Sequence, residues 1–195
     1  MEKVETKTKF CYSYIMKGQK VNRKKTGGMK MSKEINNLVL SAMAGDKDAF
    51  GKLYEYYAID MYRFALGLCK NTYDAQDAVQ DTAVSVFKSM HSLRNPDKFK
   101  SYLFLSLSNT CKRILSKNNY IVEFEDTGYT DSEIEFSIPV REALNSLDEA
   151  SREIVLLSVV GGFKSHEIGK MMDLPSATVR TKLRRTLGKL RKELE

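Results

Sequence analysis

The segment SHEIGKMMDLPSATVRTKLRRTLGKLRK, residues 165–192, decides how the C-terminal part of this chain folds. Ser165 and Ser176 are candidate N-caps of two helices. The first helix must end at Asp173-Leu174-Pro175, because the residue before a proline avoids helical torsions. The second helix has apolar residues at helical spacing, which predicts one buried stripe: Val179, Leu183, Leu187, Leu190 and Leu194. The segment therefore predicts a helix-turn-helix.

The second of these helices is strongly basic. Between Ser176 and Lys192 it carries seven basic residues and no acidic one. A solvated face usually mixes charges to gain pairings along the helix, so this bias favours DNA binding over an ordinary helical hairpin, the alternative that stays open. Cations interleaved with threonines suit phosphate oxygens and base edges. The predicted contacts are Ser176, Thr178, Arg180, Thr181, Lys182, Arg184 and Arg185.

Composition points to a polyanionic partner. The chain has a net charge of +7, a pI near 9.2 and 42% apolar residues, enough for one medium core or two small ones. No segment predicts a membrane span or a secretory signal, so we expect a cytoplasmic protein without membrane insertion. Cys11, Cys69 and Cys111 are widely spaced and, with only His91 and His166 beside them, form no zinc pattern. We expect reduced thiols, no metal site and no cofactor.

The chain divides into four segments by composition. Residues 1–31 are polar and basic and predict a disordered tail or a start-site artefact. Residues 32–117 show helical periodicity and predict a helical domain. Residues 118–138 carry six acidic side chains and no basic one, which predicts a linker. Residues 139–195 form the domain that contains the helix-turn-helix.

One helix of the 32–117 domain has a polar, acidic side. Its sequence YDAQDAVQDTAVSVFKSM, residues 73–90, places Ala75, Ala78, Val79, Thr82, Val86 and Phe87 inward and leaves Asp74, Asp77, Gln80 and Asp81 outward. No His or Cys accompanies the carboxylates, so nothing here predicts a metal or catalytic site. From the residues alone, a solvated helix face is the preferred interpretation.

The residues quoted above resemble a known family. The run from Arg141 to Leu194 is similar to the C-terminal, promoter-reading domain of bacterial sigma factors, most closely the two-domain extracytoplasmic-function type of the sigma-70 family. One departure is Asp173, where such domains commonly have glycine, although Asp tolerates left-handed torsions. The resemblance implies that the second helix enters the major groove at the −35 element. Arg180, Thr181, Arg184 and Arg185 would contact bases and phosphates, and Lys182 would clamp the backbone.

The 32–117 domain resembles the N-terminal domain of the same sigma factors. In that family the counterpart of DAQDAVQD, residues 74–81, docks on the clamp helices of RNA polymerase. An acidic and amide face with a small apolar centre can meet a basic helical surface. The resemblance assigns contact with core polymerase to Asp74, Asp77, Val79, Gln80 and Asp81.

The segment HSLRNPDKFKSYLFLSLSNTCKRIL, residues 91–115, resembles the element that melts and reads the −10 promoter region. Proteins bind single-stranded DNA by stacking its bases on aromatic rings and by pairing its phosphates with Lys and Arg. The chain has no Trp, and Phe87 and Tyr102 stand where the family often has it. Phe99 and Tyr102 could equally be core residues. The resemblance assigns a base pocket to Leu93, Arg94, Asn95, Asp97 and Lys98, and strand contact or support to Phe99, Tyr102, Asn109, Lys112 and Arg113.

These observations predict an all-α protein of two small helical domains, joined by an acidic linker, that acts as an alternative sigma factor. Its partners would be core RNA polymerase and promoter DNA, and the resemblance raises an anti-sigma factor as a further partner. Catalysis would belong to the polymerase, so we do not expect an enzyme. The alternative is a helix-turn-helix regulator that binds duplex DNA without polymerase, and a third is an adaptor that binds polymerase without opening DNA.

Overall fold

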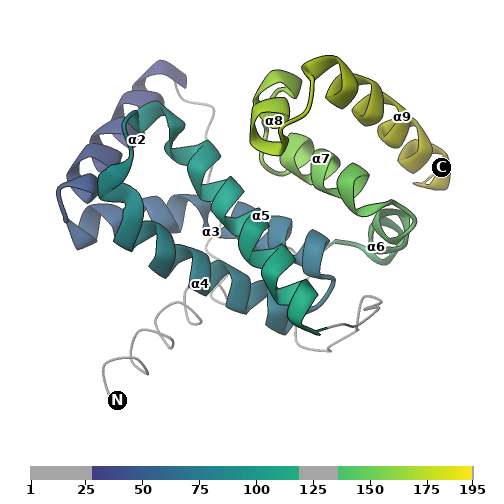
Figure 1. The fold of residues 1–195 in the computed structure, drawn as a ribbon, viewed down its shortest axis with the longest axis horizontal. Coiled ribbons are helices and arrows are strands. Elements are labelled where there is room, and N and C mark those ends of the chain that lie inside the picture. Colours follow the sequence, from purple (N-terminus) through teal and green to yellow (C-terminus); the bar gives the residue numbers. More distant parts are fainter. Residues whose placement is uncertain (1–27, 119–135, 195) are drawn as a thin grey trace.

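The structure is a computed structural model that describes residues 28–118 and 136–194 (Figure 1). Every regular element in this part of the chain is a helix, which confirms the predicted all-α class. Cys11, the tail before residue 28 and the predicted linker from 119 to 135 lie outside the described residues.

The N-terminal helices pack around one long central helix. α3 (Lys47–Cys69) contacts α2 (Gly28–Met43), α4 (Thr72–Ser89) and α5 (Phe99–Asn118). Two short 3₁₀ turns, η1 (Met90–Ser92) and η2 (Pro96–Lys98), lead from α4 into α5. The amphipathic patterns of these helices meet in a core that includes Val39, Leu53, Met61, Phe64, Val86, Phe104 and Leu107.

Side-chain caps fix where the central helices begin. The Asp46 carboxylate accepts from the backbone N–H of Asp48 at 2.9 Å and of Ala49 at 3.1 Å, which starts α3. The Asn71 side chain accepts from Tyr73 and Asp74 in the same way and starts α4. These bonds satisfy N–H groups that have no partner inside the helix.

α2 begins earlier than the sequence predicted. The boundary expected at Ser32 is wrong, because the helix starts at Gly28 and includes Met29 to Met31. These residues contain no proline, and Met and Lys are good helix formers. Residues 28–31 therefore belong to the first helix of the domain.

The C-terminal helices form a second unit. It consists of α6 (Ile138–Asn145), α7 (Glu149–Val159), α8 (Ser165–Met172) and α9 (Ser176–Leu194). The Asp148 carboxylate accepts from the Ser151 N–H at 2.9 Å and so caps the start of α7. The buried Arg152 guanidinium donates to the carbonyls of Leu144 and Leu147 at 2.9 and 2.7 Å, so it holds the end of α6 against α7.

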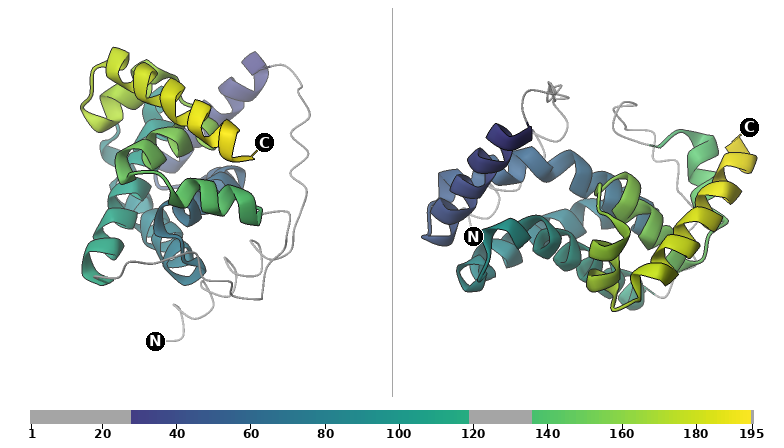
Figure 2. Two further views of the ribbon diagram at one scale, coloured as in Figure 1. Left: turned by 90° about the vertical axis from the view of Figure 1, so that its right-hand side faces the viewer. Right: turned by 90° about the horizontal axis from the view of Figure 1, so that it is seen from above.

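The two units pack against each other, with α7 lying on α3 and α8 beside α5 (Figure 2). Their buried apolar side chains belong to one continuous cluster. Within residues 28–118 and 136–194, no helix combines the length and the apolarity that crossing a membrane requires.

Candidate nucleic-acid interface

The turn between α8 and α9 has the geometry of a helix-turn-helix. Asp173 takes left-handed torsions, φ 54° and ψ 47°, and the Leu174 N–H donates to the Gly169 carbonyl at 2.8 Å. A methyl group at position 169 would lie 2.6 Å from the Leu174 carbonyl oxygen, so the backbone of the turn passes directly over this glycine. Ser165 is the first residue of α8 and not its cap. At that end the Lys164 N–H donates to the Glu167 carboxylate at 2.8 Å.

Most of the basic residues of α9 lie on its exposed side, although Lys189 also donates to the Ser146 carbonyl at 2.9 Å. Val179 is fully buried, and Leu183 and Leu190 pack on the core, so the opposite side of the helix faces solvent. Of the predicted contacts, Thr178, Arg180, Thr181, Arg184 and Arg185 are exposed, and Ser176 and Lys182 are half-buried. The structure thus brings all of them onto one helix end and its flanks.

The predicted apolar stripe of α9 is wrong at one turn. Leu187 is 40% exposed, whereas Thr186 is 7% exposed and its hydroxyl donates to the Lys182 carbonyl at 2.8 Å. Position 186 lies closer to the line through 179, 183 and 190 on a helix of 3.6 residues per turn. A threonine can occupy this buried position because the backbone satisfies its hydroxyl.

The loop before α5 presents the predicted base-pocket residues. Arg94, Asn95, Asp97 and Lys98 are exposed and Leu93 is half-buried. The Asn95 side chain accepts from the Asp97 N–H at 2.9 Å, and the Asp97 carboxylate accepts from the Asn36 amide. These bonds fix the loop, which leaves the cations at positions 94 and 98 on its surface.

Two of the predicted strand contacts on α5 do not face solvent freely. Phe99 is buried, with its ring centroid 6.1 Å from that of Tyr57, so direct contact with a strand is wrong and its place is in the core. Tyr102 is half-buried, and its hydroxyl hydrogen-bonds the Ser89 hydroxyl at 2.5 Å. Asn109, Lys112 and Arg113 are exposed.

The acidic face of α4 lies on the surface as predicted, except for one residue. Asp77 and Asp81 are exposed, and Asp74 and Gln80 are half-buried. Val79 is fully buried with Ala75 and Ala78, so it cannot contact a partner and that assignment is wrong. Burial, followed by the neighbouring charges of Asp81 and Asp74, raises the pKa of Asp77.

An apolar residue extends the acidic face of α4. Val84 is 55% exposed, and it follows Asp77 and Asp81 at steps of four and three residues, so the three share one side of the helix. Sequence reasoning missed Val84, although this spacing from Asp77 was visible. Val84 is therefore an exposed apolar side chain beside the carboxylates of this face.

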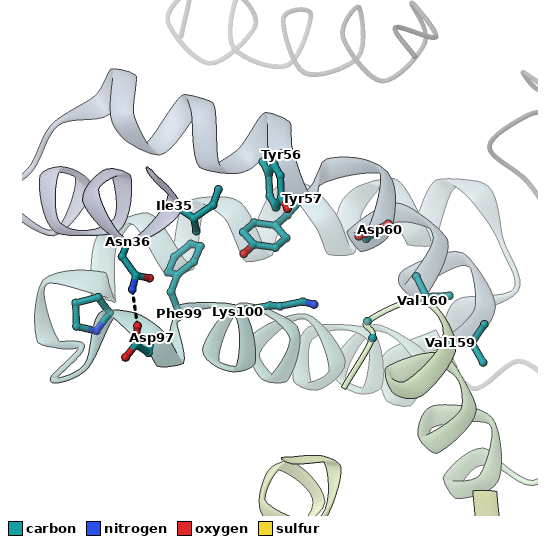
Figure 3. Close-up of a pocket in the computed structure, with 13 residues that line it drawn as sticks. Ile35, Asn36, Tyr56, Tyr57, Asp60, Asp97, Phe99, Lys100, Val159 and Val160 are labelled. Atoms are coloured by element: carbon teal, nitrogen blue, oxygen red, sulfur yellow. Dashed lines mark hydrogen bonds between the residues drawn. The ribbon is translucent and has the colours of Figure 1, made fainter. Parts of the chain in front are cut away.

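A cleft of about 760 Å³ lies where the two units meet (Figure 3). Its lining comes from α2, α3, the start of α5 and the turn after α7, and includes Tyr56, Tyr57, Asp60, Lys100 and Val160.

Across the described residues, no three His, Cys, Asp or Glu side chains gather in a way that could hold a metal ion. Cys69 and Cys111 are buried free thiols, and the hydrogen bond with Cys69, together with burial, raises the pKa of Cys111. A protonated buried thiol is a poor nucleophile.

Comparison with known proteins agrees with this arrangement. The family model of sigma-70 region 2 matches residues 53–120, and that of sigma-70 region 4 matches residues 137–190. The chain is 30% identical over 142 residues to the RNA polymerase sigma factor SigV of Bacillus subtilis, covering 69% of this chain and 84% of SigV. It is 23% identical over 184 residues to the ECF RNA polymerase sigma factor SigW of the same organism, covering 84% of this chain and 98% of SigW.

The fold is also similar to a solved structure, that of CnrH in complex with the cytosolic domain of CnrY. The TM-score is 0.67 at 24% identity, over 83% of this chain and 97% of the matched chain. This chain belongs to the extracytoplasmic-function type of the sigma-70 family. It is an alternative sigma factor, a transcription initiation factor that directs RNA polymerase to promoters.

Proposed function

We propose that three surfaces of this chain have separate binding roles in transcription initiation. The acidic face of α4 binds core polymerase, the η1–α5 region binds the −10 strand, and α9 reads the −35 element. The observation that carries this proposal is the separation of charge. Asp77 and Asp81 are exposed on α4, whereas Arg180, Arg184 and Arg185 are exposed on α9, in the other unit.

The polymerase surface consists of Asp74, Asp77, Gln80 and Asp81 with Val84 in place of Val79. Exposed carboxylates around a small apolar side chain suit a basic helical surface with an apolar centre. Burial, followed by the neighbouring charges of Asp81 and Asp74, raises the pKa of Asp77, and a cationic partner would offset the part that comes from those charges.

The −35 surface is the exposed side of α9. We propose that Arg180, Thr181, Arg184 and Arg185 contact base edges and phosphates, with Lys182 on the backbone and Ser176 and Thr178 near the N-terminal end of the helix. A helix of this kind fits the major groove, and its N-terminal residues reach base edges.

The −10 surface combines the loop and the exposed side of α5. Leu93, Arg94, Asn95, Asp97 and Lys98 would surround a flipped base, and Tyr102, Asn109, Lys112 and Arg113 would hold the adjoining strand. Phe99 would support this surface from the core without touching DNA. Proteins commonly bind single-stranded DNA with aromatic side chains, on which bases stack, beside basic side chains, which pair with phosphates.

We further propose two modules, residues 32–117 preceded by the first turn of α2, and residues 139–195, separated by the acidic segment 118–138. The chain would act in the cytoplasm, where bacterial polymerase works, and the polymerase would supply all catalysis. CnrH, whose fold this chain shares, is solved in complex with the cytosolic domain of CnrY. A comparable anti-sigma factor is therefore a reasonable partner here.

Transcription with purified core RNA polymerase on a pool of random-sequence duplexes tests this function. We expect transcripts only when the chain is added, from templates that share two conserved elements. Tight binding to duplex DNA without polymerase, and no transcripts with it, would instead support a helix-turn-helix regulator. Capture of polymerase without transcripts would support an adaptor.

A further inference from the structure

A side chain of α2 bonds directly to the loop between α4 and α5. The half-buried Asn36 amide donates to Oδ1 of Asp97 at 2.5 Å, across 61 positions of sequence (Figure 3). Hydrogen bonds that a carboxylate accepts are stronger than those between neutral groups. α2 also contacts both 3₁₀ turns of this loop, η1 and η2. The first helix of the chain therefore holds one residue of the proposed base pocket.

Bonds inside the loop shape its two turns. The Leu93 N–H donates to the Met90 carbonyl at 3.0 Å, which closes the first turn. The Lys98 N–H donates to the Asn95 carbonyl at 3.0 Å, which closes the second. The Asn95 side chain accepts from the Asp97 N–H at 2.9 Å and so fixes the backbone at position 97. None of these bonds orients the Asp97 carboxylate, whereas the bond from α2 does.

The Asp97 side chain depends on the Asn36 bond for its direction. Met90 and Phe99 are 1% and 2% exposed, so the core anchors both ends of the loop. Asp97 itself is exposed, and exposed side chains otherwise change rotamer within nanoseconds. The bond from Asn36 therefore selects one direction for a carboxylate whose backbone is already fixed.

An oriented carboxylate at this place can distinguish bases. An ionised carboxylate only accepts hydrogen bonds and does so at both oxygens, so Oδ2 can accept while Asn36 occupies Oδ1. Both residues line the cleft of about 760 Å³, so the pair borders open space (Figure 3). A flipped base is recognised on its Watson–Crick edge. Cytosine and adenine present an amino group there, and thymine and uracil present a carbonyl oxygen, so a fixed carboxylate favours the first two.

We propose that Asn36 is a positioning residue that sets the base preference of the −10 loop, because it directs the Asp97 carboxylate toward the exocyclic amino group of the flipped base. The proposal rests on the assignment of the −10 surface under Proposed function. Without Asn36 the exposed cations Arg94 and Lys98 still attract the strand. The loop should then bind DNA but distinguish amino-bearing from carbonyl-bearing bases poorly.

The test compares Asn36→Ala with Asn37→Ala, the same change at the next residue of α2, which is exposed. Each protein, as holoenzyme, is bound to a promoter fragment selected from the random pool, with its nontemplate −10 strand left unpaired. Cytosine, adenine and uracil are compared at each position of that strand by competition.

We expect one position at which wild type and Asn37→Ala bind an amino-bearing base about five- to tenfold tighter than uracil. Asn36→Ala should reduce this ratio to about twofold or less, and its preferences at the other positions should equal those of wild type. If Asn36→Ala keeps every preference of wild type, even with a uniform loss of affinity, Asn36 serves the fold alone and the proposal is overturned. A wild type without preference for an amino-bearing base at any position would overturn it as well.

Asp97→Asn provides a second test that does not depend on the stability of Asn36→Ala. The new amide carbonyl can still accept from Asn36, which turns the amide NH₂ toward the base. The preference at that one position should therefore invert, to uracil over cytosine. In an Asn36→Ala background the amide loses its partner, and Asp97→Asn should no longer invert the preference.

Absence of inversion in Asp97→Asn, or equal inversion in both backgrounds, would contradict the role of Asn36. In either case a wild type that still directs transcription leaves the proposed function intact. Failure of the wild-type holoenzyme to bind and transcribe any fragment would instead defeat the proposed function itself.

Discussion

The carboxylate of Asp81 on α4 lies 2.9 Å from the guanidinium of Arg113 on α5. Asp81 belongs to the proposed polymerase surface and Arg113 to the proposed −10 surface, so the two surfaces adjoin. Both side chains are exposed, and such a pair contributes only about 0–1 kcal/mol. A substitution at Asp81 nevertheless disturbs both surfaces, which makes Asp77 the better probe of polymerase binding.

The tight turn of the helix-turn-helix depends on Gly169. In Gly169→Ala the new methyl group would meet the Leu174 carbonyl at 2.6 Å, and a backbone atom cannot rotate away. We expect a loss of about 1–3 kcal/mol in the free energy of unfolding, measured by urea denaturation. Gly188→Ala is the control, because its methyl group would meet nothing within 4 Å, and it should stabilise α9 by about 0.5–1 kcal/mol. Equal stability of the two variants would contradict the geometry of the turn.

The cap of α7 should make stability depend on pH in a defined direction. The hydrogen bonds from Ser151 lower the pKa of Asp148. A carboxyl with a lowered folded-state pKa adds stability above its ordinary pKa of about 3.9, and that stability is lost as pH falls through the folded value. Asp148→Ala should cost about 1 kcal/mol near neutral pH, and the gap to wild type should narrow below about pH 4.

Asp148→Asn is the matched variant for this cap, because asparagine keeps the acceptor and loses the charge. Its stability near neutral pH should stay close to that of wild type. Thermal melting across pH values measures all three proteins. A gap between wild type and Asp148→Ala that widens on acidification would contradict the cap assignment.

The acidic segment offers a test of its role in the holoenzyme. We expect that replacing Glu123, Glu125, Asp126, Asp131, Glu133 and Glu135 by amides weakens transcription with core polymerase, because a uniformly negative segment suits a basic channel. The melting temperature should not change. Transcription equal to wild type would mean that the segment serves only as a tether.

Local patterns predicted most of the fold and which sides of α4 and α9 are exposed. The inward side of α4, with Ala75, Ala78 and Thr82, is buried as its spacing indicated, and Asp173 takes the left-handed turn. The basic side of α9 is exposed for the same reason. These features depend on helical periodicity and on torsional preferences, which are properties of neighbouring residues.

The errors arose where two interpretations of one residue competed. Val79 belonged both to the inward stripe and to the family's contact segment, and packing decided in favour of the core. In α9 the apolar spacing places Leu187 in the buried stripe, but Thr186 is buried instead, because its hydroxyl donates to the Lys182 carbonyl. The hydrogen bond from the Ser108 hydroxyl of α5 to the buried Glu153 carboxylate of α7 could not be predicted, because the two residues are 45 positions apart and no local pattern links them.

The central claim is that one face of the chain binds polymerase and another binds the promoter. Asp77→Lys and Arg184→Ala test it together, with Glu142→Lys and Lys192→Ala as exposed charge controls outside the proposed contacts. Each protein is assayed for capture of core polymerase and, as holoenzyme, for binding to a promoter fragment selected from the random pool. We expect Asp77→Lys to lose core capture, since like charge against a basic partner costs several kcal/mol. Arg184→Ala should capture core normally and bind the promoter about 1–3 kcal/mol more weakly. Normal core capture by Asp77→Lys, or loss of core capture by Arg184→Ala, would contradict the account.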